Sequence, residues 1–342
     1  MIPHNRPTLG KEEEDAAIRV LRSGWVAQGP EVEGFENDIC AYLGLPDGHA
    51  VAVSSGTAAL FLALKILNAR GKKVAFPAYA CSALRNACVM SGGIPLLVDN
   101  RENSPNIDLT ALEKSGAEIA IVPHMFGFPV DVPQDSGISI IEDCAQALGA
   151  SVGGQPVGLT GEMGIYSFYA TKLMTTGGQG GMVVSKNMSL IDQIRDYREF
   201  DCRNDQRIRF NFQMTDLQAA VGREQLKKLP RFLARRQEIF DLYQRSGLNI
   251  MDETMSSFQP LKAVRFRAVL KTDEPRAIID LLARFQTKGI VPIEEWELLG
   301  EAQLFPKARK LTRTTVSLPI YPTLTGEEVD LIISVIGKGG EK

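Results

Sequence analysis

The chain has 342 residues, of which 44% are hydrophobic and 23% charged, and its formal net charge is −3. This length favours one large domain joined to a smaller one, with enough apolar residues for a sizeable core. The absence of a basic face or basic run argues against nucleic acid or an anionic membrane as a partner, and the most apolar stretch, ALFLALKIL, is too short to span a bilayer.

Short apolar runs between residues 50 and 185 predict the strands of one sheet. The runs are nearly continuous in apolar residues rather than alternating, which is typical of strands buried on both faces of a mostly parallel sheet. Helical segments at 56–70, 108–116 and 189–200 separate them and predict an α/β fold with helices on either side. The runs cover residues 50–54, 73–77, 94–99, 118–124, 138–143, 164–169 and 181–185.

The sequence changes character after residue 214. A long helical region follows, with Thr215 as its predicted N-cap and Pro230 as a predicted kink or break. A strand-like run at 262–270, a helix at 275–288 and a capping-box spacing between Thr325 and Glu328 come next.

These elements predict a large domain over 1–235 and a smaller α+β domain over 236–342. The boundary is soft, because the long helix could bridge the two parts. About the first 25 residues could pack on the smaller domain.

Three small residues open the first helix of the predicted sheet domain. Ser55, Gly56 and Thr57 follow the strand at 50–54, so their backbone N–H groups and the helix dipole could bind an anion such as phosphate. An ordinary helix cap is the alternative for these residues.

Two other strands of the predicted sheet end next to groups that could carry chemistry. Asp143 ends one strand, Gln146 lies one turn further on, and Lys172 follows the strand at 164–169. The carboxyl ends of parallel strands are where such sheets bind ligands. Pyridoxal phosphate (PLP) needs an anion site, a carboxylate for its ring nitrogen and a lysine for its aldehyde, and this set offers all three. A capping aspartate and a solvated lysine are the alternatives.

The chain resembles the DegT/StrS group of sugar-nucleotide aminotransferases, which have PLP fold type I. The likeness covers nearly the whole chain, and its motifs occur in the family's order. They are LRSGWVAQGPEVEGFENDICAYLG, VSSGTAAL, EDCAQALGA, SFYATK, NFQMTDLQAAVGREQLKKL and VSLPIYPTLTGEEVD.

The resemblance implies a role for each matching residue. Lys172 forms the Schiff base with PLP, Asp143 pairs with the pyridine nitrogen and Gln146 approaches the phenolic oxygen. The phosphate is held by Ser55, Gly56, Thr57, Ser167 and, from the neighbouring subunit of a homodimer with shared sites, Asn211. Lys172 and Asp143 are the expected catalytic residues, and no metal is expected, since only three histidines occur.

The implied reaction moves an amino group from an amino acid, usually glutamate, to a keto-sugar that is nucleotide-linked. Two alternatives stay open: an aminotransferase acting on a cyclitol or another small ketone, and a non-catalytic PLP-binding sensor. The family's dehydratases replace the Schiff-base lysine with histidine, so the presence of Lys172 argues against that activity.

The chain departs from the family pattern at several places. Cys81 stands where an aromatic residue usually stacks on the cofactor ring, and Tyr79 is expected to point elsewhere. Gln179 and Gln213 replace a usual glutamate and arginine, and the segment 289–300 lacks a usual histidine. Because these last three changes lie near the expected acceptor pocket, they leave the substrate open.

Other residues have competing interpretations. His124 ends a strand facing the same crevice, where an anchoring role is favoured over a chemical one. Trp25, Phe126 and Tyr321 could line the acceptor pocket, although large aromatics more often belong to the core. The five cysteines show no CxxC spacing, and no signal peptide is evident, so a reduced cytoplasmic protein is expected.

Overall fold

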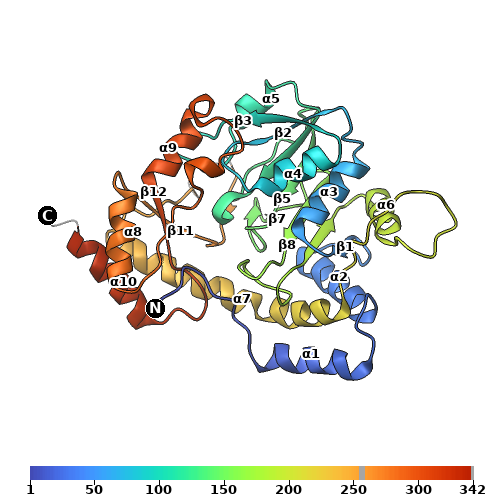
Figure 1. Cartoon of the computed structure of the whole chain (residues 1–342), viewed down its shortest axis with the longest axis horizontal. Coiled ribbons are helices and arrows are strands. Elements are labelled where there is room, and N and C mark those ends of the chain that lie inside the picture. Colours follow the sequence, from blue (N-terminus) through green and yellow to red (C-terminus); the bar gives the residue numbers. More distant parts are fainter. Residues whose placement is uncertain (254–258, 340–342) are drawn as a thin grey trace.

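The computed structural model describes residues 1–253 and 259–339, and its main feature is a seven-stranded sheet with the order β1-β9-β8-β5-β4-β2-β3 (Figure 1). All strands but β9 run in one direction, and β9 is antiparallel to both its neighbours. The predicted mostly parallel sheet is therefore confirmed, with each predicted run forming a strand. The strands are β1 (Ala50–Val53), β2 (Lys73–Pro77), β3 (Ile94–Val98), β4 (Ile119–Pro123), β5 (Ser139–Asp143), β8 (Met163–Ser167) and β9 (Gly181–Val184).

Helices cover both faces of this sheet because its strands are apolar on both sides. α3, α4 and α6 pack on the face that carries Val51 and Val53, whereas α2 and the first half of α7 pack on the face that carries Ala50 and Ala52. The helices are α1 (Lys11–Ser23), α2 (Pro30–Leu43), α3 (Gly56–Ile66), α4 (Ser82–Met90), α5 (Leu109–Glu113), α6 (Met188–Arg198), α7 (Asp216–Arg245), α8 (Pro275–Arg284), α9 (Pro306–Thr314) and α10 (Gly326–Gly339).

Helix α7 runs without interruption through Pro230, so a predicted break at this residue is wrong. It begins with a capping box between Thr215 and Gln218, which confirms Thr215 as the N-cap. Proline removes one backbone hydrogen bond from a helix, but Leu229 and Phe232 on either side of it are buried. Their packing holds the helix together, and Figure 1 shows α7 extending from beneath the sheet to the C-terminal elements.

The C-terminal part has its own core around the second half of α7. Phe240 and Tyr243 of α7 pack with Leu270, Val316 and Ile332 in one apolar cluster. The predicted capping box is present, with Thr325 N donating to Glu328 Oε2 at 2.9 Å. Two small sheets complete this region: β11 (Ala268–Lys271) with β12 (Thr315–Leu318), and β10 (Leu261–Lys262) with β6 (Ser151–Val152) and β7 (Gln155–Pro156).

The N-terminal segment divides its contacts between the two parts of the chain. Ile2 forms a β-bridge with Thr287, and His4 Nε2 lies 2.9 Å from Ser317 Oγ. Helix α1, by contrast, lies along α7 (Figure 1), where Ala16 and Val20 pack against Ala220. Within the part of the chain that the structure describes, no helix is long and apolar enough to cross a membrane.

Candidate active site

Most of the predicted site residues lie at one edge of the sheet. The parallel strands end there, so Asp143 at the end of β5, Ser167 at the end of β8 and the turn after β1 share this edge. Strand β9 begins at the same edge, because Gly181 pairs with both Val53 and Ser167. The topology thus brings together residues that are more than a hundred positions apart in sequence.

The turn after β1 and the end of β8 approach each other very closely. A Cβ atom on Gly56 would lie 2.9 Å from Ser167 Cβ, and one on Gly181 would lie 2.3 Å from the carbonyl of Ser55. Ser55 is the N-cap of α3 and accepts a hydrogen bond from Ala58 N at 3.1 Å. Thr57 is exposed at the first turn. The N-terminus of an eleven-residue helix is therefore open beside a serine hydroxyl, an arrangement suited to phosphate.

A cavity of about 490 Å³ lies next to this edge. Of the predicted site residues, Cys81, Gln146 and Lys172 line it, together with Phe126. Its far wall comes from the C-terminal part of the chain, with Phe266 and Arg267 from the segment leading into β11 and Pro292 to Leu299 from the loop before α9. The cavity thus lies between the main sheet and the C-terminal elements.

Lys172 sits in the turn that follows β8, where its N–H donates to Tyr169 O at 2.9 Å. Its Nζ lies 5.4 Å from the centroid of the Phe266 ring. Burial lowers the pKa of Lys172, while the negative charge of Asp143 acts in the opposite direction. A lysine with a lowered pKa has a larger neutral fraction at physiological pH and is a better nucleophile.

Asp143 is the acidic partner of this lysine. Its side chain is buried, and Oδ1 accepts a hydrogen bond from Ala145 N at 3.0 Å. Burial raises the pKa of Asp143, and both this hydrogen bond and the charge of Lys172 counteract that effect. A buried acid and a half-buried amine with opposite pKa shifts at one strand edge are typical of a catalytic site.

The Gln146 side chain stabilises an unusual backbone conformation of Phe126 at the cavity wall. Its Oε1 accepts from Phe126 N at 2.8 Å, and Phe126 has φ +60°, which bulky side chains rarely adopt. Gln146 Nε2 lies 3.9 Å from Met125 Sδ, a weak acceptor. Much of the donor capacity of this amide is therefore left for a ligand.

Cys81 is exposed to the cavity, whereas Tyr79 is fully buried. Tyr79 packs edge-on against Phe126 with ring centroids 6.2 Å apart and does not line the cavity. Cys81 also occupies the N-cap position of α4, which begins at Ser82, but its thiol makes no capping hydrogen bond. The thiol, not the tyrosine ring, thus lies where a ligand could contact it.

His124 anchors the neighbouring loop rather than lining the cavity. Its Nε2 lies 3.1 Å from Glu142 Oε2, and its Nδ1 accepts from Val130 N at 2.9 Å. Glu142 also accepts hydrogen bonds from the backbone of residues 158, 160 and 161. Although His124, Glu142 and Cys144 lie close enough together to bind a metal ion, these bonds occupy the carboxylate and the imidazole in a structural role.

The family model for DegT/DnrJ/EryC1/StrS aminotransferases matches residues 7–337. The chain belongs to this aminotransferase family. It is 31% identical to the spore coat polysaccharide biosynthesis protein SpsC of Bacillus subtilis, covering 98% of this chain and 96% of that protein. It is 30% identical to the dTDP-4-dehydro-2,3,6-trideoxy-D-glucose 4-aminotransferase of Saccharopolyspora spinosa, covering 100% of this chain and 97% of the relative.

A solved structure, the aminotransferase TlmJ from Streptoalloteichus hindustanus, has the same fold. It superposes with a TM-score of 0.92 at 25% identity, covering 99% of this chain and 98% of TlmJ. The expected PLP fold type I is thereby confirmed.

Some predicted residues of this aminotransferase lie outside the cavity. Asn211 is exposed, and its Oδ1 accepts from Gln213 N at 3.0 Å. Trp25 and Tyr321 do not line the cavity, and for Tyr321 the core role expected of large aromatics holds. Trp25 bonds to Gln28 O near α2, and Tyr321 is buried in the C-terminal core because it follows β12.

Several residues of the cavity wall were not predicted from the sequence, among them Arg85, Arg267 and Trp296. Trp296 occupies the segment that lacks the family's histidine. Arg267 had a signal in the sequence, because it interrupts an apolar strand-like run that leads into β11. A charge within such a run is costly unless it faces a ligand or a partner.

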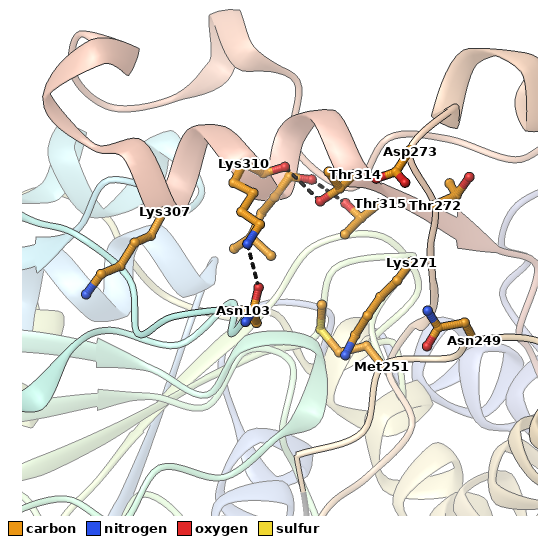
Figure 2. A pocket seen from close by; sticks show the side chains of 11 residues that line it. Asn103, Asn249, Met251, Lys271, Thr272, Asp273, Lys307, Lys310, Thr314 and Thr315 are labelled. Atoms are coloured by element: carbon orange, nitrogen blue, oxygen red, sulfur yellow. Dashed lines mark hydrogen bonds between the residues drawn. The ribbon is translucent and has the colours of Figure 1, made fainter.

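A second pocket of this aminotransferase, of about 220 Å³, contains none of the predicted site residues (Figure 2). It is lined by Lys271, Lys307 and Lys310 with several threonines and asparagines. Lys310 reaches Asn103 at 3.0 Å, and Lys307 pairs with Asp108 at 2.9 Å. Two of its three lysines therefore already have partners within the chain.

Proposed function

We propose that this protein is a PLP-dependent aminotransferase that transfers an amino group from an amino acid, with glutamate as the expected donor, to a nucleotide-linked keto-sugar. The observation that carries the proposal is the placement of Lys172 on a cavity wall, in electrostatic contact with buried Asp143. Family membership over residues 7–337 supports the same reaction class.

The residues present fit PLP. The close approach of Gly56 to Ser167 leaves the N-terminus of α3 free to hold the phosphate, with Ser55 and Thr57 beside it. Asp143 has the charge to hold a proton at the ring nitrogen, and Gln146 Nε2 can donate to the phenolic oxygen. Cys81 would lie against the ring.

When bound, PLP supplies an electrophilic carbon and an electron sink. Lys172 would bind it covalently and, once free as a neutral amine, would move the proton at the substrate Cα. Burial lowers the pKa of Lys172 and so favours the neutral amine that both tasks require. Asp143 would provide the negative charge that holds a proton at the ring nitrogen.

The acceptor is inferred from relatives and from the cavity. The Saccharopolyspora spinosa relative is an aminotransferase for a dTDP-linked keto-sugar. The cavity volume of about 490 Å³ falls within the usual range for small-molecule sites. A nucleotide-linked keto-sugar is therefore the acceptor class that we propose for this chain.

We further propose a homodimer in which Asn211 completes the phosphate site of the partner. Asn211 is exposed and is absent from the cavity of its own chain. The residues before it, Ile208 and Phe210, are 81% and 60% exposed. Exposed apolar side chains that lie close together in this way are a feature of protein–protein contact surfaces.

The experiment that tests the proposal is a coupled transamination assay. The purified protein is incubated with PLP, L-glutamate and a panel of dTDP-, UDP- and GDP-linked 4-keto-sugars, cyclitol ketones and simple ketones, and amino products are identified by mass spectrometry. Conversion of a nucleotide-linked keto-sugar that is lost in Lys172→Ala supports the proposal. Conversion of cyclitol or simple ketones alone would change the acceptor, and bound PLP without turnover on any acceptor would favour a sensor.

A further inference from the structure

Arg267 is a cation on the cavity wall without a matching negative charge. Among the described residues, no carboxylate forms an ion pair with it, and its buried Nε has no hydrogen-bond partner. Nη1 lies 3.3 Å from Ser317 Oγ and 3.4 Å from His4 Nε2. Burial, together with the charge of Arg267, lowers the pKa of His4 to about 3, so this histidine is neutral. Neither neighbour compensates the guanidinium charge.

The acidic residue on the same wall does not compensate it either. Glu297 lines the cavity and attracts Arg267 electrostatically, but no ion pair joins the two side chains in the described part of the chain. Its Oε2 accepts a hydrogen bond from Glu294 N at 2.8 Å, which directs it toward its own turn. Because an unpaired charge away from water is costly, a bound anion is the group that would offset it.

A second buried arginine holds the segment that carries Arg267. Arg236 on α7 is fully buried, and its Nη1 donates to the carbonyls of Arg265, Phe266 and Ile320 at 3.3, 3.3 and 2.8 Å. These bonds fix the backbone on the N-terminal side of Arg267. The backbone that carries Arg267 is thus held before any ligand binds, and the contacts of Nη1 with Ser317 and His4 orient the guanidinium, which is the arrangement expected of a binding residue.

The geometry also limits which anion can reach Arg267. Lys172 Nζ and Arg267 Cζ lie 5.4 and 5.6 Å from the centroid of the same ring, that of Phe266. In an amino acid, the carboxylate is attached to the carbon that carries the reacting amine, so it lies close to the atom that meets Lys172. The phosphates of a nucleotide-linked sugar are several bonds further from the reacting ketone. Arginine also binds planar carboxylates through two parallel hydrogen bonds.

We infer that Arg267 binds the α-carboxylate of the amino donor, and of the keto acid that leaves, during the proposed reaction. This inference rests on the proposed function, because it requires an amino acid as substrate. It assigns donor recognition to the C-terminal part of the chain and proton transfer to the sheet edge.

The test compares three donors that differ in one carboxylate. L-glutamate has both carboxylates, L-glutamine keeps only the α-carboxylate, and the α-amide of glutamate (isoglutamine) keeps only the γ-carboxylate. The donor half-reaction of the PLP-loaded enzyme is followed by the decay of its visible absorption band under single-turnover conditions. Wild type, Arg267→Gln, Arg267→Lys and Arg85→Gln are compared, the last variant removing an exposed charge from the same cavity wall.

Wild type is expected to use L-glutamine much better than isoglutamine. Arg267→Gln should weaken apparent binding of L-glutamate and L-glutamine by roughly 10- to 100-fold while changing isoglutamine little, because a charge-assisted pair is lost only with the α-carboxylate. Arg267→Lys should show part of the wild-type preference for L-glutamine over isoglutamine, and Arg85→Gln should show all of it. Equilibrium binding of 2-oxoglutarate, measured by calorimetry, should weaken in parallel.

A preference for the α-carboxylate that survives in Arg267→Gln would overturn the inference. Weaker use of L-glutamate and isoglutamine, but not of L-glutamine, would instead assign Arg267 to the γ-carboxylate and also overturn it. Thermal unfolding shows whether Arg267→Gln is folded, and Arg267→Lys carries the test if it is not. A wild-type enzyme that loads PLP but reacts with no amino acid would refute the proposed function and this inference with it, a result distinct from either of the others.

Discussion

A Cβ atom added to Gly56 would lie 2.9 Å from Ser167 Cβ, which joins the start of α3 to the end of β8. Gly56→Ala should force these two segments apart, at a cost of about 1–3 kcal/mol in stability. Because the separation opens the proposed phosphate site, we expect PLP affinity to fall by at least roughly tenfold, or about 1.4 kcal/mol. Thermal unfolding and a PLP titration measure the two effects. Gly326→Ala, where a Cβ meets nothing within 4 Å and the backbone has no positive φ, is the control, and equal PLP affinity in both variants would argue against the site.

The lowered pKa of Lys172 predicts the pH dependence of PLP attachment. Burial disfavours the charged amine, so the attachment rate should rise with pH and reach its midpoint below the value of about 10.4 for an ordinary lysine. Asp143 raises this pKa, so Asp143→Asn should move the midpoint to still lower pH. Stopped-flow absorbance at several pH values provides the measurement. A midpoint unchanged by Asp143→Asn would show that the two groups do not interact.

The lowered pKa of Lys172 also makes the stability of the PLP-free protein depend on pH. The folded protein binds fewer protons at Lys172 than the unfolded chain does between the two pKa values, so the PLP-free protein should become more stable as pH rises through that window. Lys172→Met, which removes the buried charge, should abolish this gain.

Asp143→Asn should lower the transamination rate by at least roughly a hundredfold, equivalent to about 3 kcal/mol of lost electrostatic stabilisation. The substitution keeps the size of the side chain and removes its charge. Since burial already raises the pKa of Asp143, the PLP-free variant should be no less stable than wild type, which thermal unfolding can check. Retention of most of the wild-type rate would contradict the proposed pairing with the ring nitrogen.

The carboxylate of Glu142 should be a major anchor of the loop that contains residues 158–161. Glu142→Gln places an amide N–H₂ group against backbone N–H donors and should cost about 2–4 kcal/mol. Although burial acts to raise the pKa of Glu142, hydrogen bonds from His124 and the backbone hold it below its ordinary value. Its stabilisation is therefore present above the unfolded pKa and is lost as pH falls through the folded pKa.

Urea unfolding at pH 7 and at pH 4 tests this anchor. The difference between wild type and Glu142→Gln should shrink at the lower pH. Glu162→Gln, at an exposed residue of the same region, should change stability by less than about 0.5 kcal/mol. A Glu142→Gln variant as stable as this control would show that the hydrogen bonds contribute little.

The proposed shared site can be tested by mixing two inactive chains. Asn211→Asp places a negative charge against the partner's phosphate site, and Lys172→Ala removes the nucleophile. In a mixed dimer with shared sites, one site carries both defects and the other carries neither, so activity should return to about a quarter of the wild-type level for random exchange. Mass spectrometry confirms the exchange. No recovery in confirmed mixed dimers would place Asn211 in its own chain's site.

The sequence by itself determined the sheet and the chemistry of its edge. Continuous apolar runs predicted every strand of the sheet because burial on both faces leaves no polar alternation. Lys172, Asp143 and Gln146 could be identified because each lies at or shortly after the end of a predicted strand, where parallel sheets bind ligands. The capping signals at Thr215 and Thr325 were also readable, since a cap depends only on residues within one turn.

Only the tertiary structure decided what closes the cavity. Arg267 and Trp296 reach it because the C-terminal part packs against the sheet edge, a contact between distant segments that no local pattern encodes. The continuity of α7 through Pro230 likewise depends on buried neighbours that outweigh one missing hydrogen bond. Local patterns determined the secondary structure and the reactive residues, whereas long-range packing determined which charges surround them.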